Sequence, residues 1–128
     1  MNINLVQICG RLTKEPELRT TTSGTKVLSI GVATNRTYKD KEGKKVEETE
    51  YHNVTAFGRT AEVIEQYFNK GDEIYIQGRL KTSSWEKDGV KFYKTEILAD
   101  KFEFGQKAKV NMGGAPSKSE VSVEDLPL

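Results

Sequence analysis

The chain has 128 residues, 30% of them charged and 35% hydrophobic, with a formal net charge of +1. This length is typical of one domain with one hydrophobic core. The single cysteine, Cys9, excludes an internal disulfide and a paired-cysteine metal site. No apolar run reaches membrane-spanning length, and the N-terminus lacks a signal-peptide pattern. We therefore expect a cytoplasmic protein that contacts no membrane.

The first half of the chain predicts three strands separated by polar connections. Apolar residues that alternate with polar ones favour strands. The expected elements are a strand over 4–12, a loop over 13–24, a strand over 25–35, a solvated hairpin tip over 39–45, and a strand over 46–57. In the last of these strands, Tyr51 and Phe57 fall on one face, and Val54 falls on the other.

The second half predicts one helix and two further strands. Apolar residues at helical spacing indicate a helix over 60–70, with Thr60 as its N-cap and Gly71 just past its end. Strands over 73–82 and 91–104 follow, joined by a hairpin loop over 83–90. The order β-β-β-α-β-β is that of an all-β protein with one helix, the five-stranded OB-fold Greek-key barrel.

The composition changes after residue 105. Residues 106–128 carry many small and polar residues, such as Gly113, Gly114, Ser117 and Ser119, and have little to bury, so we expect a disordered tail. The predicted organisation is therefore a barrel domain over 1–105 and a flexible tail over 106–128. The tail ends in acids followed by Leu126-Pro127-Leu128, and apolar groups beside acids suit docking into a partner's pocket.

Four aromatic residues lie among cations and small polar groups, at Tyr38, Tyr51, Phe57 and Trp85. Aromatic faces stack on any nucleobase and cations hold phosphates, which is how proteins bind single strands without reading sequence. The alternative is that all four belong to the core. Phe57, beside the helix start, is the one expected to be partly buried, and Trp85, in a polar loop, is the least.

Several segments together resemble the single-stranded DNA-binding protein family of bacteria and phages. The matching segments are 10–19, 49–59, 61–63 and 70–80. The resemblance implies an OB-fold, a homotetramer and non-enzymatic binding of single-stranded DNA. It implies base stacking by Tyr38, Tyr51, Phe57 and Trp85, the first two standing where the family often has Trp. The expected phosphate ligands, which flank these rings or lie on the adjoining strand, are Arg36, Arg59, Arg79, Lys81 and Lys87.

The resemblance also implies two protein contacts. His52 matches a position at the subunit interface of family members. The tip Glu124, Asp125, Leu126, Pro127 and Leu128 matches the peptide that docks replication, recombination and repair proteins, although Leu128 replaces the usual terminal Phe.

Other functions fit the sequence less well. A nuclease would need clustered carboxylates that bind a cation, and the aspartates of this chain are scattered near turns. A primosome-type OB-fold adaptor would lack the acidic tip. RNA binding stays open, because stacking does not distinguish the sugars. We expect no metal and no cofactor, and we expect Cys9 to be a small buried residue.

Overall fold

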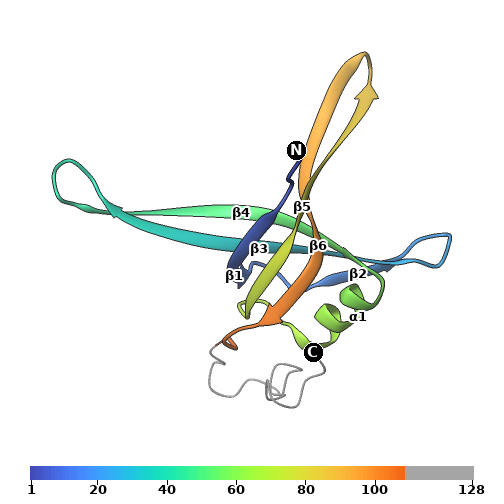
Figure 1. The fold of residues 1–128 in the computed structure, drawn as a ribbon, viewed down its shortest axis with the longest axis horizontal. Coiled ribbons are helices and arrows are strands. Elements are labelled where there is room, and N and C mark those ends of the chain that lie inside the picture. The colour runs from blue at the N-terminus through green and yellow to red at the C-terminus, as the bar shows by residue number, and fades with distance from the viewer. Residues whose placement is uncertain (109–128) are drawn as a thin grey trace.

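The computed structural model describes residues 1–108 as six strands and one helix (Figure 1). The elements are β1 (Val6–Leu12), β2 (Glu17–Thr20), β3 (Lys26–Lys39), β4 (Lys45–Phe57), α1 (Gly58–Tyr67), β5 (Glu73–Lys87) and β6 (Val90–Phe104). The sheet order is β1-β5-β6-β4-β3-β2, and β1 also pairs with β3. That last pairing closes β1, β5, β6, β4 and β3 into a five-stranded barrel, which confirms the expected fold.

The core lies inside this barrel and under α1. Alternation along the strands sends every second side chain inward: Leu28, Ile30 and Val32 from β3, and Ile74 and Ile76 from β5, are all nearly or fully buried. The helix closes one end of the barrel with Ala61 and Ile64, and Phe68, just past the helix end, joins them in the core. The ring of Phe68 stacks on Phe104, with 4.8 Å between the ring centroids.

Two glycines permit the close strand approaches that the barrel needs. A Cβ at Gly10 would collide with the backbone of Ala33, where β1 meets β3. A Cβ at Gly78 would collide with the backbone of Leu98, where the β5–β6 register shifts between Gln77 and Gly78. Both positions therefore require the absence of a side chain.

Two hairpins extend beyond the barrel as arms (Figure 1). The β3–β4 ladder continues out to Lys39 and Lys45, and the β5–β6 ladder continues out to Lys87 and Val90. The prediction of a loop over 83–90 was wrong, because the strands continue through most of this range. Only Asp88 and Gly89, with φ of 53° and 77°, turn the chain. Two positive φ values form the type I′ turn that tight hairpins prefer. The arm lacks apolar alternation because both of its faces meet solvent.

Two other local predictions were also wrong. The expected loop over 13–24 contains the short strand β2, which pairs with β3 and rests Leu18 on the core. The helix begins at Gly58 rather than Thr60, with Phe57 as its N-cap and no side-chain cap. It ends at Tyr67 because Phe68 turns into the core in extended conformation, so Gly71 belongs to the following turn rather than to the helix end.

The chain remains attached to the barrel for three residues past 105. Asp72, only 1% exposed, accepts hydrogen bonds from the backbone N–H of Asn69 at 2.9 Å and of Ala108 at 2.8 Å. The Lys107 ammonium lies 4.0 Å from the same carboxylate and donates to the carbonyl of Tyr67 at 3.2 Å. This cluster fixes where the C-terminal segment leaves the barrel.

Candidate nucleic-acid interface

The outer face of β4 carries two of the predicted stacking residues. Val54 points into the core, so Tyr51 and Phe57, at odd spacing from it, point outward. Tyr51 is 73% exposed and Phe57 is 48% exposed. Their ladder partners on β3 are the smaller Ala33 and Val27, which leave much of both rings uncovered. These rings are therefore available to a ligand.

Trp85 belongs to the same outer face, on the β5–β6 arm. Ile97 on β6 pairs with Val54 on β4 and also points inward. Successive side chains on a strand alternate between faces, so Leu98 points outward. Phe92, six residues before Leu98, therefore points outward too. Phe92 is the ladder partner of Trp85, and partners share a face. Trp85 is 48% exposed, and it lies in a strand rather than in the expected loop.

Tyr38 is not brought to this face. It pairs with Val46, and the unbroken β3–β4 register puts both on the opposite side of the arm from Tyr51. The Arg36 guanidinium lies 5.2 Å from the ring centroid of Tyr38. A hydrogen bond to the Glu48 carboxylate, together with its negative charge, raises the pKa of the Tyr38 phenol above its ordinary value. Tyr38, Arg36 and Glu48 thus form a separate cluster.

Two hollows adjoin the outer face of β4. One, of about 230 Å³, lies over β2, β3, β4 and β6, and its lining includes the cations Lys14, Arg19 and Lys94. Its acids are partly engaged: Glu96 accepts a hydrogen bond from the Thr55 hydroxyl at 2.8 Å and lies 3.9 Å from Lys94. A smaller hollow of about 170 Å³ separates Tyr51 from Leu80 at the base of the β5–β6 arm. A chain of nucleotides could follow these hollows across the sheet.

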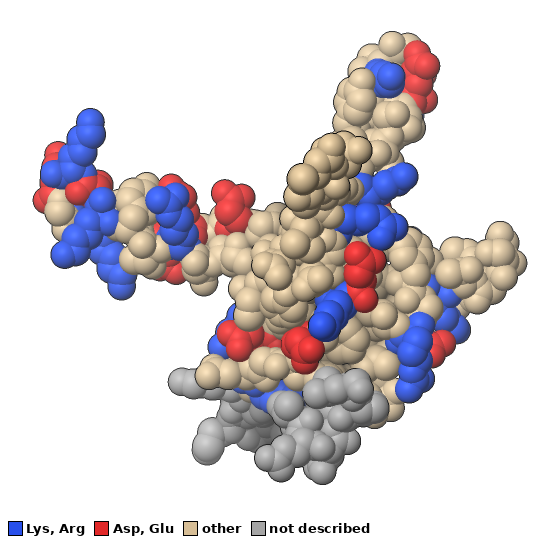
Figure 2. Space-filling model, viewed as in Figure 1, with Lys and Arg blue, Asp and Glu red and all other residues tan. Residues whose placement is uncertain are grey.

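The five predicted phosphate ligands fall into two groups. Arg36, Arg59 and Arg79 have acidic neighbours, Glu48 at 4.0 Å, Glu62 at 3.7 Å and Asp100 at 3.1 Å respectively. Such exposed pairs are worth at most about 1 kcal/mol, so a phosphate can compete with them. Lys81 and Lys87 have no ion pair in the part of the chain that the structure describes. Figure 2 shows cations gathered where the β5–β6 arm leaves the barrel.

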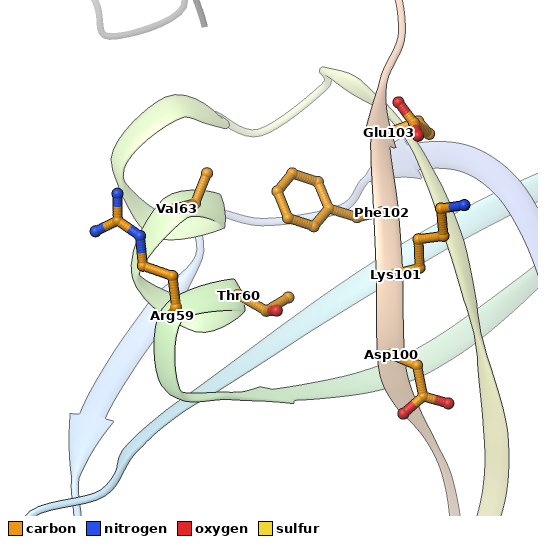
Figure 3. A pocket seen from close by; sticks show the side chains of 7 residues that line it. All are labelled: Arg59, Thr60, Val63, Asp100, Lys101, Phe102 and Glu103. Atoms are coloured by element: carbon orange, nitrogen blue, oxygen red, sulfur yellow. The ribbon is translucent and has the colours of Figure 1, made fainter. Parts of the chain in front are cut away.

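A third hollow lies away from the aromatic face. It has a volume of about 420 Å³ and separates α1 from β6 (Figure 3). Phe102 points toward the helix and, with Val63, gives the hollow an apolar floor, whereas Lys101 and Glu103 leave β6 on the other side. Arg59 lines this hollow from the start of α1, and Asp100, the ion-pair partner of Arg79, lines it from β6.

The structure reveals exposed apolar residues that the sequence did not single out. Leu80, Val90, Phe92 and Tyr93 are all exposed, and three of them lie on the β6 half of the arm. The Asp88-Gly89 pair was the signal that could have found Phe92. A two-residue turn there fixes the register and puts Phe92 opposite Trp85.

The structure also locates two single side chains that the sequence analysis singled out, those of His52 and Cys9. His52 is half-buried, and its Nε2 is 2.9 Å from the Thr34 hydroxyl. Cys9 is exposed, so the expectation of a buried cysteine was wrong. It lies on the outer side of β1, because alternation turns its neighbour Ile8 toward the core.

The described residues hold neither a metal cluster nor a membrane span. No three His, Cys, Asp or Glu side chains within 1–108 are grouped so that they could hold a metal ion. The helix in this range is too short and too polar to cross a membrane. The predicted docking tip, residues 124–128, lies outside the described residues.

Comparisons with known proteins agree with this geometry. The model of the single-strand binding protein family matches residues 3–105. A single-stranded DNA-binding protein of Neisseria meningitidis is 37% identical over 117 residues, which are 91% of this chain and 67% of that protein.

Solved structures of single-stranded DNA-binding proteins have the same fold. The wild-type single-stranded DNA binding protein from Thermus aquaticus superposes with a TM-score of 0.72 at 33% identity, over 81% of this chain. The match covers half of the Thermus chain. The Plasmodium falciparum SSB in complex with ssDNA gives a TM-score of 0.71 at 26% identity, over 80% of this chain and 93% of that one.

Proposed function

The chain belongs to the single-strand binding protein family, and from this premise we propose that it binds single-stranded DNA without reading the base sequence. Proteins of this family bind DNA and are not enzymes, so the nuclease alternative falls away. One observation carries the proposal for this chain: Tyr51, Phe57 and Trp85 are exposed on one face, beside cations.

Stacking on these rings selects unpaired bases. In a duplex each base face is covered by its neighbours, whereas in a single strand it is free to meet an aromatic ring. Each engaged base contributes about 1–3 kcal/mol, and every base has a face to offer. The exposed rings therefore support binding that depends on strandedness and not on sequence.

Cations on and around the aromatic face complete the site, with Arg36 on the opposite side of the β3–β4 arm and Arg59 at the hollow between α1 and β6. Arg36, Arg59, Arg79, Lys81 and Lys87 are the proposed phosphate ligands. Each contact adds about 0.7 to the magnitude of the slope of log K against log salt on a single strand. Lys81 and Lys87 rank first, because a phosphate there displaces no ion-pair partner among the described residues. Lys14, Arg19 and Lys94 line the hollow beside β4 and extend the track.

Tyr38 takes a second position on the path of the strand. It stands on the other side of the β3–β4 arm, so a bound strand reaches it only by passing around that arm. The family often has Trp at this position and at Tyr51, and the smaller phenol ring offers less area for stacking.

The cellular role follows from holding strands open. Bound protein protects exposed strands during DNA replication, recombination and repair, in the cytoplasm and at the nucleoid, or in the host cytoplasm if a phage encodes it. The tip Glu124, Asp125, Leu126, Pro127 and Leu128 recruits partner proteins of these pathways. Four copies assemble into a homotetramer, with His52 at the subunit interface.

Fluorescence anisotropy with labelled oligonucleotides tests the proposal. Oligo(dT) should bind strongly, matched duplex should bind weakly, and mixed-sequence single strands should bind about as well as oligo(dT). Oligo(U) measures the preference between DNA and RNA. Equal affinity for duplex and single strand would contradict the proposal.

A further inference from the structure

Trp85 has a neighbour on the β5–β6 arm that adds to its surface. The rings of Trp85 and Phe92 are stacked, with centroids 5.8 Å apart and planes 19° from parallel. Trp85 is 48% exposed and Phe92 is 41% exposed. In such an offset stack each ring covers only part of the other, and both side chains keep much of their surface exposed.

The arm holds this pair in solvent. The Asp88-Gly89 turn pairs Lys87 with Val90, and two steps back along the ladder it pairs Trp85 with Phe92. Every residue from 79 to 95 is exposed, so the barrel core covers neither ring. The pair is therefore a preformed aromatic surface of two rings on a ribbon of two strands.

Cations flank the two rings on the same face of the arm. On this face, Lys87 lies two residues from Trp85 toward the turn, and Lys94, the ladder partner of Ser83, lies two residues from Phe92 toward the barrel. Lys81 follows one step further toward the barrel. Diagonal neighbours on one face of a ribbon lie about 7–8 Å apart, which is within reach of long side chains. Phosphates on either side of a stacked base would meet one of these ammonium groups.

We propose that Phe92 is a further base-stacking residue, which forms one two-ring site with Trp85 on the outer face of the arm. The inference rests on the proposed function and adds a residue to its binding surface. A base stacks on the free face of either ring, and the contact between the rings keeps both upright. Phe92 contributes area and orientation, and the flanking lysines contribute charge.

A purely structural role for the pair makes a different prediction. Cross-strand aromatic pairs stabilise hairpins, so the loss of Phe92 could weaken binding only by loosening the arm. Thr82 and Thr95 form a second cross-strand contact, with hydroxyl oxygens 2.9 Å apart, on the opposite face of the same ribbon. Thr82→Ala loosens the arm without touching the aromatic face, and it is the matched control.

The test is the affinity of the full chain for labelled oligo(dT) at several salt concentrations. We expect Phe92→Leu to weaken the Kd about fivefold or more, with the slope of log K against log salt unchanged because no charge is lost. Phe92→Tyr should bind like the unmodified protein, and so should Thr82→Ala.

Three results would overturn the inference, and they are distinguishable. Unchanged affinity of Phe92→Leu would remove Phe92 from the site while the proposed function stands. An equal loss in Thr82→Ala would assign the effect to the stability of the arm. Failure of the unmodified protein to bind oligo(dT) would overturn the proposed function and this inference together.

Discussion

The predicted stacking residues Tyr51 and Tyr38 differ in their immediate surroundings, and these surroundings rank their expected contributions to binding. Tyr51 stands opposite Ala33 and is 73% exposed. Tyr38 has the Arg36 guanidinium over its ring and its hydroxyl bonded to Glu48. A base that stacks on Tyr51 finds the ring free, whereas a base at Tyr38 must displace Arg36 or use the other face.

The first prediction compares these two tyrosines. Tyr51→Ala should weaken oligo(dT) binding by about 1–3 kcal/mol, or roughly 5- to 150-fold in Kd. Tyr38→Ala should cost less, because part of its ring is already occupied. Anisotropy titrations of both variants under identical salt check the ranking, and a larger loss at Tyr38 would contradict it.

The second prediction concerns the pH dependence of the single thiol. Although Cys9 is exposed, partial loss of water around its sulfur and the negative charge of Glu73 raise the pKa of its thiol, and the positive charge of Arg11 opposes them. The native thiol should therefore react with iodoacetamide more slowly at pH about 8 than the unfolded chain, whose thiol has the ordinary pKa of about 8.5. Because the thiol's pKa is higher in the folded than in the unfolded protein, the Cys9 thiol adds its full contribution to folding stability below the unfolded pKa. It is lost as pH rises through the folded pKa.

Glu73→Gln supplies the control for the thiol. It removes the carboxylate charge while it keeps an oxygen that can accept the Gln106 backbone hydrogen bond. Alkylation should become faster in this variant. A native thiol that reacts as fast as the unfolded one at every pH would refute the shift.

Among the elements, β5 serves both the barrel and an arm. Its first part, with Ile74 and Ile76, is buried, and its second part, from Arg79 onward, is exposed. The change comes at the register shift beside Gly78. A bulge bends a strand and increases its twist, so this position directs the arm away from the barrel.

The third prediction tests that junction. In Gly78→Ala the new methyl group meets the backbone of Leu98, so the strands must move apart. Overpacking of this kind typically costs about 1–3 kcal/mol of unfolding free energy. Thermal unfolding should show a lower Tm, whereas Ser83→Ala, further out on the exposed arm, should leave Tm nearly unchanged. Equal Tm values for Gly78→Ala and the unmodified protein would contradict this account.

The strands show what could be predicted from sequence at this scale. Leu28, Ile30 and Val32 alternate with small or polar residues, and the burial of all three confirms the expected face of β3. The strand β2 was missed because four residues beside a proline and a run of threonines carry almost no periodicity. The outer part of the β5–β6 arm was missed because a ribbon with two wet faces needs no apolar alternation.

At the scale of the whole molecule, the barrel sets the directions of two arms that leave it on different sides (Figure 1). The sequence predicts the strands and their order, but not where each arm points. Closure depends on contacts distant in sequence, such as Gly10 against Ala33. The same holds for the site: alternation puts Tyr51 and Phe57 together, but only the ladder register separates Tyr38 from them and brings Phe92 to Trp85.

The net charge of +1 is consistent with a local binding surface. Cations gather near the base of the β5–β6 arm, and acids lie close by (Figure 2). Long-range attraction of DNA is therefore weak, and stacking must supply much of the affinity. Binding should then persist at moderate salt, unlike binding that depends on many phosphate contacts.

The most direct measurement is a titration of the intrinsic tryptophan fluorescence with oligo(dT), repeated at several salt concentrations, beside matched duplex DNA. Trp85 is the only tryptophan in the chain, so the signal reports one stacking position. We predict strong quenching by the single strand, little by duplex, and quenching that survives moderate salt. Absence of quenching, or equal quenching by duplex, would mean that Trp85 does not stack on bases and would contradict the central claim.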